Sequence, residues 1–310
     1  MSRIVSAGIP GGRLSRRSAV GKLAGAGAAA AVAAAGLGMS RDAAQGASSR
    51  VRSSVVTTKE GNTMIDTTPD DKRGPLTVAL VHGAFADASG WNGVIERLQA
   101  AGVAVTCPPN PLRGISHDAA YVASFLNQIP GPVLLVGHSY GGAVITNAGS
   151  KVKNAVGLVY VAGFAPDEGE ILLDIEKGSR DSVLLSALVP LQYPTGNGTE
   201  TATEFAIKPD KVQEAFAADL PQSQTALLAA TQRPIAELTF AEPTTAPAWK
   251  TLPTWAVVPT GDKTIGSDAV RFMAERAEAT IVEVEGSHVI MISQPQAVTD
   301  VIMTAIDTVS

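Results

Sequence analysis

The sequence is poor in cysteine and histidine, and this scarcity removes several classes of site. Its 310 residues include one cysteine, Cys107, and four histidines. A single cysteine excludes an intrachain disulfide, and the Cys-x-x-Cys pairs that typically bind zinc are absent. No Gly-x-Gly-x-x-Gly follows an apolar strand-like run, so a dinucleotide-binding turn is not indicated. We therefore expect no metal and no cofactor, and we place Cys107 in a buried strand.

Positive charge is also scarce once the first 46 residues are set aside. The whole chain has a formal net charge of −5. Residues 1–46 hold six basic residues and one acidic residue, which leaves a net charge of −10 on the remainder. An acidic protein of this kind repels a phosphate backbone. The sequence therefore argues against a nucleic-acid partner.

Residues 1–46 are typical of a twin-arginine signal peptide rather than of a folded domain. Arg16 and Arg17 precede an apolar run rich in alanine and glycine, residues 23–39. The run is too short and too weakly apolar to predict a stable membrane anchor. We expect cleavage near residues 44–46. An uncleaved alanine-rich helix or a wrongly chosen start codon is the alternative.

A polar segment rich in serine and threonine, residues 47–70, follows the signal and predicts a flexible linker. Together the two segments predict a bacterial protein that is exported to the periplasm or the exterior. The twin-arginine export machinery is then a partner during secretion only.

Residues 71–310 alternate between apolar runs and helix-period segments. A mostly parallel sheet with helices on both faces requires this alternation. The predicted strands are 76–81, 103–107, 133–136, 156–161, 254–258 and 280–284. The predicted helices lie near 90–101, 117–128, 140–152, 267–277 and 295–308. We expect one α/β domain without internal repeats.

A Gly-x-Ser-x-Gly pattern, residues 137–141, follows one of these strands directly and opens a helix of small residues. This is the context of a nucleophile elbow, a sharp strand-to-helix turn that raises a serine above the sheet. Glycines are required on both sides because the strand and helix backbones nearly touch there. Ser139 is therefore the candidate nucleophile.

A serine hydroxyl needs a base, and the four histidines permit elimination. His82 opens a glycine turn, where a structural hydrogen bond is the favoured role. His138 neighbours the serine and should point away from it, and His117 lies near the start of a helix. His288 remains, on a Gly-Ser loop after the strand-like run 280–284. Because the expected chain order is serine, acid, histidine, His288 is the candidate base.

The acid should follow a strand between Ser139 and His288. Asp262 lies in the loop after the run 254–258 and is our choice. A Gly-Asp dipeptide can also simply close a turn. Asp268, the expected N-cap of the next helix, is the second candidate.

Acyl transfer also needs two backbone N–H groups directed at the developing oxyanion. One is expected from Tyr140, the residue after the serine. The other should come from the loop after the first strand, where Gly83 precedes Ala84. Ala84 is the assignment and Phe85 the alternative.

The interval between the fourth and fifth predicted strands is too long for a simple crossover and predicts a helical lid over the serine, about 167–248. Four segments within it read as helical, namely 171–177, 181–188, 210–220 and 223–230. A Pro-containing stretch, 190–194, and a Gly/Thr-rich stretch, 195–203, separate them. Apolar lid residues should mostly pack within the lid, while some face a mainly apolar pocket.

Taken together, the segments 81–84, 137–142, 261–262 and 287–295 resemble the α/β-hydrolase superfamily. Within it they are most similar to the branch of plant methylesterases, hydroxynitrile lyases and bacterial esterases, over about residues 75–308. The resemblance implies the α/β-hydrolase fold, with Ser139 as nucleophile, His288 as base and Asp262 as acid. It also implies an oxyanion hole formed by Ala84 and Tyr140.

The lyases of that branch have a hydroxyl residue after the first loop histidine and a lysine after the catalytic histidine. This chain has Gly83 and Val289 there. We therefore expect a serine hydrolase acting on a small or medium carboxylic ester through an acyl-enzyme, with a preference for uncharged apolar esters. A lyase or cofactor-free peroxidase-like activity on the same triad, or a ligand-binding protein of the same fold, are the alternatives.

Overall fold

The computed structural model describes residues 74–310, and the predicted signal peptide, residues 1–46, and linker, residues 47–70, lie outside this part. Six parallel strands form the central sheet in the order β2-β1-β3-β4-β8-β9. Their bounds are β1 Thr77–Val81, β2 Ala104–Thr106, β3 Val133–His138, β4 Ala155–Val161, β8 Thr254–Pro259 and β9 Thr280–Val284. Each overlaps one predicted strand. Strands β1, β3, β4 and β8 are largely buried, and buried parallel strands are written as continuous apolar runs, whereas β2 and β9 are partly exposed edge strands.

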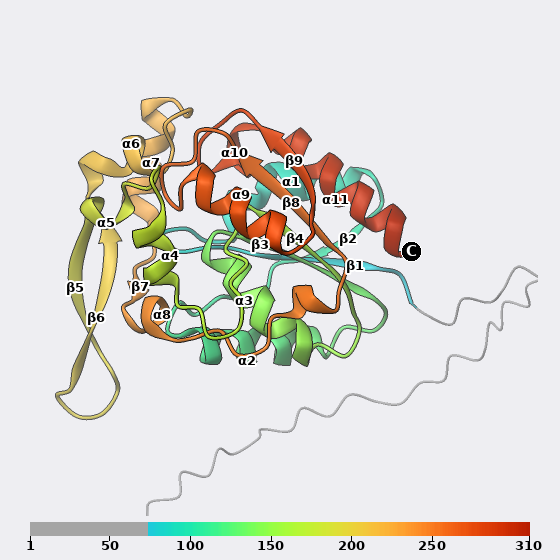
Figure 1. Ribbon diagram of the computed structural model, residues 1–310, viewed down its shortest axis with the longest axis horizontal. Coiled ribbons are helices and arrows are strands. Elements are labelled where there is room, and N and C mark those ends of the chain that lie inside the picture. Colours follow the sequence, from blue (N-terminus) through green and yellow to red (C-terminus); the bar gives the residue numbers. More distant parts are fainter. Residues whose placement is uncertain (1–73) are drawn as a thin grey trace, which may run out of the picture. The chain divides into compact units, whose positions relative to one another are not determined.

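Helices cover both faces of this sheet (Figure 1). On one face α1 packs against α11, and on the other α2 packs against α3. The helices outside the β4–β8 connection are α1 Asn92–Ala100, α2 Ile115–Leu126, α3 Tyr140–Ala148, α9 Ser267–Arg276, α10 Ile290–Ser293 and α11 Pro295–Val309. None of the described helices is both long and apolar enough to cross a bilayer.

The connection from β4 to β8, residues 162–253, is called the insertion below. It contains the helices α4 Leu172–Gly178, α5 Leu184–Ala187, α6 Val212–Ala215, α7 Gln222–Thr231 and α8 Leu238–Ala241. It also contains an antiparallel sheet of β5 Leu188–Pro194, β6 Thr201–Ile207 and β7 Ile235–Ala236. The β5–β6 hairpin extends from one side of the domain (Figure 1).

The prediction of an all-helical insertion is therefore wrong in part. The helix expected over 181–188 is only the single turn α5, after which the chain enters β5. The helix expected over 210–220 is reduced to a 3-10 turn and α6. Pro190 and Pro194 read as breaks, but both fit in β5 because it is an edge strand that pairs with β6 alone.

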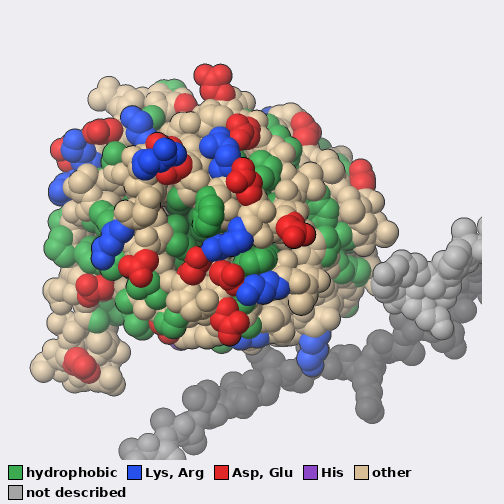
Figure 2. Space-filling view, in the orientation of Figure 1, with side chains coloured by type: hydrophobic (Ala, Val, Ile, Leu, Met, Phe, Trp, Pro, Cys, Tyr) green, Lys and Arg blue, Asp and Glu red, His purple; other side chains and the backbone are tan. Residues whose placement is uncertain are grey.

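Acidic and basic side chains are interspersed over the face shown in Figure 2, with hydrophobic side chains between them. Several of these charges are paired across elements, such as Arg276 with Glu170 at 2.5 Å and Arg271 with Glu283 at 2.6 Å. The Arg271–Glu283 pair is exposed and contributes little to stability, whereas Arg276 and Glu170 are partly buried and form a bidentate pair. The core beneath them is one contiguous cluster that includes strands β1, β3, β4 and β8.

Strand β3 and helix α3 approach each other so closely that only glycine fits between them. A β-carbon on Gly137 would lie 2.5 Å from the carbonyl oxygen of Gly141. A β-carbon on Gly142 would lie 2.5 Å from the carbonyl oxygen of Phe164. These are backbone atoms within the core, so neither can move aside cheaply.

We expect Gly137→Ala to destabilise the fold by about 3 kcal/mol or more, since it forces backbone apart in a closely packed region. Urea unfolding measures the effect. Gly178→Ala is the matched control, because a β-carbon there meets no atom within 4 Å and its backbone is not left-handed. Equal effects of the two substitutions would contradict the argument.

Candidate active site

The three residues proposed from the sequence as a triad follow three strands of the same sheet. Ser139 comes directly after β3, Asp262 lies in the loop after β8, and His288 lies in the loop after β9. Because all these strands are parallel, their carboxyl ends meet at one edge of the sheet. Ligand sites of open α/β sheets form at this edge.

Ser139 has a strained backbone. Its φ is 54° and its ψ is −125°, a combination that a residue with a side chain rarely adopts. The cost, on the order of 1–3 kcal/mol, is tolerated because the glycine contacts around the turn fix its path. Such strain is typical of a nucleophile elbow.

Asp262 and His288 form a buried pair. His288 Nδ1 lies 2.8 Å from Asp262 Oδ2, and both side chains are fully buried. The other carboxylate oxygen, Oδ1, accepts the backbone N–H groups of Thr264 at 2.7 Å and Ile265 at 3.1 Å. These bonds fix the carboxylate, and the carboxylate fixes the histidine ring with its proton on Nδ1.

The second candidate acid, Asp268, does not reach His288. Its Oδ1 accepts the Ser179 hydroxyl at 2.6 Å and its Oδ2 accepts the Arg180 N–H at 3.0 Å. Burial opposes ionisation, but these hydrogen bonds outweigh it and lower the pKa of Asp268 to about 2. Asp268 therefore joins α9 to the insertion rather than taking part in the buried pair.

The second ring nitrogen of His288, Nε2, is available to accept a proton. Because Nδ1 donates to Asp262, Nε2 carries the lone pair, and it has no hydrogen-bond partner among the described residues. A buried nitrogen without a partner costs free energy in a resting fold. An imidazole nitrogen in this state can take a proton from a hydroxyl that approaches it.

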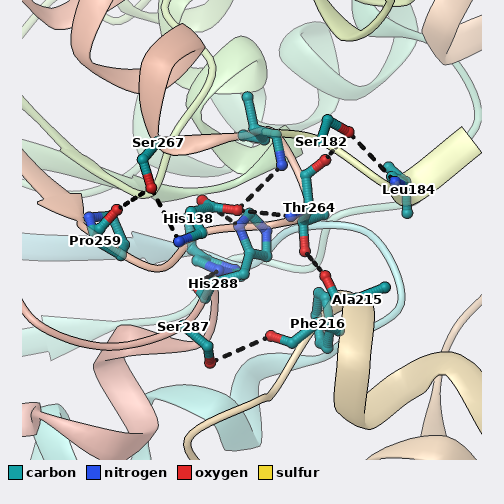
Figure 3. A network of polar contacts seen from close by, with 12 residues as sticks. His138, Ser182, Leu184, Ala215, Phe216, Pro259, Thr264, Ser267, Ser287 and His288 are labelled. Atoms are coloured by element: carbon teal, nitrogen blue, oxygen red, sulfur yellow. Dashed lines mark hydrogen bonds and ion pairs between the residues drawn. The ribbon is translucent and has the colours of Figure 1, made fainter. Parts of the chain in front are cut away.

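His138 contacts His288 through a hydrogen bond to its backbone. Its Nε2 lies 3.0 Å from the carbonyl oxygen of His288, which can only accept, so His138 donates there. The two rings are 4.7 Å apart at their centroids (Figure 3). Burial, followed by the proximity of His288, holds the pKa of His138 well below its usual value. His138 is thus a neutral support for the His288 loop.

The other two histidines serve elsewhere. His82 Nδ1 contacts the Gly83 carbonyl at 2.9 Å, and burial lowers the pKa of His82. His117 is exposed on α2, with its Nδ1 2.9 Å from Asp118 Oδ1. Neither contacts Asp262.

The two predicted oxyanion donors lie on either side of Ser139. Ala84, Phe85, Ser139 and Tyr140 line one small cavity. The Phe85 amide donates to the carbonyl of Arg233 at 3.0 Å, so it is occupied. Among the loop, cap and side-chain hydrogen bonds of the described residues, the amides of Ala84 and Tyr140 have no acceptor. Ala84 is therefore the better fit of the two alternatives.

Tyr140 is also held through its side chain. Its hydroxyl donates to Asp118 Oδ2 at 2.9 Å, deep between α2 and α3. Asp118 in turn accepts the Arg113 amide at 3.0 Å. Burial and the Asp118 carboxylate raise the pKa of Tyr140 well above its usual value. The first turn of α3, including the Tyr140 amide, is thereby anchored.

The insertion closes this cavity from above. Leu172, Leu184, Ile235 and Phe240 of the insertion contribute to its walls. Its volume is about 10 Å³, roughly the space that one water molecule needs. Ser139 is only 4% exposed. In this conformation the serine has little contact with bulk solvent.

Thr264 fastens the insertion to the Asp262 loop. Its hydroxyl donates to the Ala215 carbonyl at 2.6 Å, and its own carbonyl accepts the Ser182 hydroxyl at 2.6 Å. Figure 3 shows Thr264 between Ser182 and Ala215, beside the histidine pair. The loop that positions Asp262 is therefore held from two sides by the insertion.

A second set of contacts fastens the insertion to the His288 loop. Asp219 accepts both the hydroxyl and the backbone N–H of Ser287, the latter at 3.0 Å. The Phe216 ring lies 5.3 Å from the His288 ring. Burial opposes ionisation of Asp219, yet its hydrogen bonds to serine lower its pKa. Sequence reasoning missed Asp219, because nothing in its local pattern indicates a partner 68 residues away.

Glu176, on α4, is a buried acid that sequence reasoning also missed. It is 3% exposed, and burial raises its pKa to about 8. Its Oε2 lies 2.7 Å from the Ser182 hydroxyl, which already donates to Thr264. A hydroxyl has one proton to give. Protonated Glu176 therefore donates to Ser182, which donates to Thr264.

Three comparisons with known proteins place this fold. The sequence model described as "Alpha/beta hydrolase family" matches residues 78–301. The chain therefore belongs to the alpha/beta hydrolase family, and the resemblance seen in its motifs is confirmed. A curated protein named "Carbendazim hydrolyzing esterase", from Nocardioides sp. (strain SG-4G), is 30% identical over 107 residues. The match spans 30% of this chain and 44% of that protein.

Solved structures with the same fold include three enzymes of low sequence identity. Tomato methylketone synthase I with 2-tridecanone is 19% identical, with a TM-score of 0.61 over 76% of this chain and 99% of its own. Polyneuridine aldehyde esterase is 20% identical, with a TM-score of 0.64 over 74% and 99%. A pyrethroid hydrolase from Sphingobium faniae JZ-2 is 18% identical, with a TM-score of 0.61 over 75% and 98%. At these identities the likeness establishes the fold.

We expect Glu176→Gln to stabilise the protein at alkaline pH. The folded-state pKa of about 8 exceeds the ordinary value of 4.5, so the native state holds the additional proton and loses stability as pH rises between these values. Each pKa unit is worth about 1.4 kcal/mol, so the loss by pH 8.5 is a few kcal/mol. Glutamine keeps a donor for Ser182 and cannot ionise.

Thermal unfolding at pH 5 and pH 8.5 tests this expectation. The variant should exceed wild type by several degrees at pH 8.5, and the gap should narrow at pH 5. Glu275→Gln, on the exposed face of α9, is the control and should change little. A gap that is the same at both pH values would show that ionisation of Glu176 is not the cause.

Proposed function

We propose that the protein is a serine carboxylic ester hydrolase that works through an acyl-enzyme. The buried Asp262–His288 pair, at the same sheet edge as the strained Ser139 turn, carries this proposal. The chemistry needs a nucleophile, a base whose tautomer is fixed and donors for the oxyanion. The candidate residues sit at one sheet edge in the required chain order.

In the first half-reaction Ser139 Oγ attacks the ester carbonyl carbon while its proton passes to His288 Nε2. Asp262 stabilises the imidazolium that results and keeps the ring in place. The carbonyl oxygen becomes an oxyanion and accepts the amides of Ala84 and Tyr140. Tyr140 opens α3, so the positive end of the helix dipole adds to this stabilisation.

The tetrahedral intermediate then collapses. The ester C–O bond breaks, and the proton on His288 Nε2 passes to the departing alcohol. In the second half-reaction a water molecule gives a proton to His288 and attacks the acyl carbon. Collapse of this second intermediate breaks the bond to Ser139 Oγ, which recovers the proton, and the carboxylic acid leaves.

The space around Gly83 supports hydrolysis over cyanohydrin cleavage. A β-carbon on Gly83 would lie 2.6 Å from the β-carbon of Ser139 and 2.8 Å from the carbonyl of His138. A hydroxyl-bearing residue there would force the Ser139 turn to shift. Val289 is fully buried, where a lysine would be an unpaired charge. The features expected of the lyases therefore do not suit this site.

Substitution of Ser139 tests the nucleophile. We expect Ser139→Ala to lower kcat for p-nitrophenyl esters by about 10⁴-fold or more while the thermal unfolding transition stays within a few degrees. A fluorophosphonate probe should label wild type at Ser139, as mapped by mass spectrometry, and leave the variant unlabelled. Ser124→Ala, on the exposed face of α2, is the control.

Retained turnover in Ser139→Ala would overturn the proposal. Product analysis in ¹⁸O-labelled water separates the alternatives. Hydrolysis places one labelled oxygen in the acid, whereas a lyase releases a carbonyl product without net hydrolysis. Stoichiometric ligand binding without any product would favour a binding protein.

We further propose that residues 1–46 direct export by the twin-arginine pathway. Replacing Arg16 and Arg17 together by lysine should leave the uncleaved precursor in the cytoplasm, because that machinery reads the arginine pair. Immunoblots of cell fractions measure this. Arg13→Lys is the control within the same segment. A processed, exported double variant would contradict the proposal.

A further inference from the structure

The insertion holds a second and much larger hollow close to the candidate active site. This hollow, called the hairpin groove, has a volume of about 740 Å³. Its walls include Leu188, Tyr193, Ala202 and Phe205 of the β5–β6 hairpin and Leu238 and Phe240 of α8. The volume is within the range of pockets that hold small organic ligands. The cavity at Ser139 has about 10 Å³ and holds no acyl group of any length.

At one point a single side chain separates the two spaces. Phe240 lines both of them. Two pairs of consecutive residues also divide between them: Leu172 and Leu184 face the Ser139 cavity, and Leu173 and Leu185 face the groove. The groove and the Ser139 cavity therefore lie on opposite faces of the same group of residues.

Phe240 is a part of the wall that can move without breaking the hydrogen bonds that hold the insertion. The insertion as a whole is tied down, since Thr264 bonds Ala215, Asp219 bonds Ser287, and Phe85 bonds the Arg233 carbonyl. Opening by lifting the insertion would break all of these contacts. Phe240 instead lies on α8, a single helical turn, with its ring 6.2 Å from Phe205 in an edge contact. A change of its rotamer leaves the other contacts intact.

The groove selects for apolar, uncharged groups. Its walls are mainly leucine, phenylalanine and alanine, and Glu237 is the one ionisable acid among them. Leu185 and Leu238 at the groove are 40% and 52% exposed, so apolar surface continues to the solvent. Figure 2 shows hydrophobic side chains at the surface over the flank where α8 and the hairpin lie. Glu237 repels a free carboxylate, which disfavours retention of an acid product.

We propose that the hairpin groove binds an extended apolar arm of the ester and that Phe240 is the gate between this arm and Ser139. The proposal rests on the proposed ester hydrolysis and narrows its substrate class to esters with one arm of several carbon atoms. Such an arm fills the groove while the ester carbon sits at Ser139. An acetate ester of a small alcohol leaves the groove empty and gains nothing from it.

The ratio of kcat/KM for p-nitrophenyl octanoate to that for the acetate is the first measurement. We expect Ala202→Trp, which fills the groove from β6, to lower this ratio by about tenfold or more. We expect Phe240→Ala, which removes the gate, to raise it by a similar factor. Thr201→Trp, next to Ala202 but exposed and outside the groove, is the control and should keep the wild-type ratio.

A second substrate series shows which arm of the ester enters the groove. The p-nitrophenyl alkanoates vary the acyl arm, and alkyl acetates of increasing chain length vary the alcohol arm. The series whose chain-length dependence changes in Ala202→Trp identifies the arm. Labelling of Ser139 by fluorophosphonates gives a readout without turnover. The ratio of the labelling rate of an octyl fluorophosphonate to that of the methyl compound should fall in Ala202→Trp and rise in Phe240→Ala, as the kcat/KM ratio does.

The two proposals fail in different ways. Wild type that neither turns over esters nor takes up either fluorophosphonate overturns the hydrolase and the groove together. Wild type that is active, with chain-length ratios that Ala202→Trp and Phe240→Ala leave unchanged in both series, overturns the groove alone. A Thr201→Trp variant that shifts the ratios as Ala202→Trp does would also overturn it, since the effect would then come from the hairpin's shape.

Discussion

The hydrogen bond between His288 Nδ1 and Asp262 Oδ2, at 2.8 Å, joins the loop after β8 to the loop after β9. Both side chains are buried, so the bond acts in a medium of low effective dielectric, where an unpaired carboxylate would be costly. Each partner therefore has its own supports: two amides on Asp262, and the His138 side chain on the His288 carbonyl. The site is built outward from this pair.

The insertion is hydrogen-bonded to both loops that carry this pair. Thr264, two residues after Asp262, bonds the insertion through its hydroxyl and its carbonyl. Ser287, one residue before His288, bonds Asp219 of the insertion. The contacts that close the cavity are therefore adjacent in sequence to the residues that would perform the chemistry. We therefore expect changes in the insertion to alter the positions of Asp262 and His288 through these two loops.

Much of this could be predicted from the sequence, for identifiable reasons. Buried parallel strands are continuous apolar runs, so the sequence predicts β1, β3, β4 and β8. The Gly-x-Ser-x-Gly turn and the ends of later strands predict Ser139, Asp262 and His288 as the candidate site residues. The β5–β6 hairpin could not be predicted in the same way. Pro190 and Pro194 suggest breaks in secondary structure, but an edge strand such as β5 tolerates proline. Asp219 and Glu176 were missed because their partners are set by tertiary packing rather than by any local pattern.

The low exposure of Ser139, 4%, bears on the order of events in the proposed reaction. The cavity at Ser139 has about 10 Å³, so the proposed mechanism needs a more open conformation to admit the ester. The closed state strengthens every electrostatic contact at the oxyanion, because water is excluded there. The open state admits the reactants. In the proposed mechanism the Phe240 side chain controls entry, while the Asp262–His288 pair controls the proton transfers.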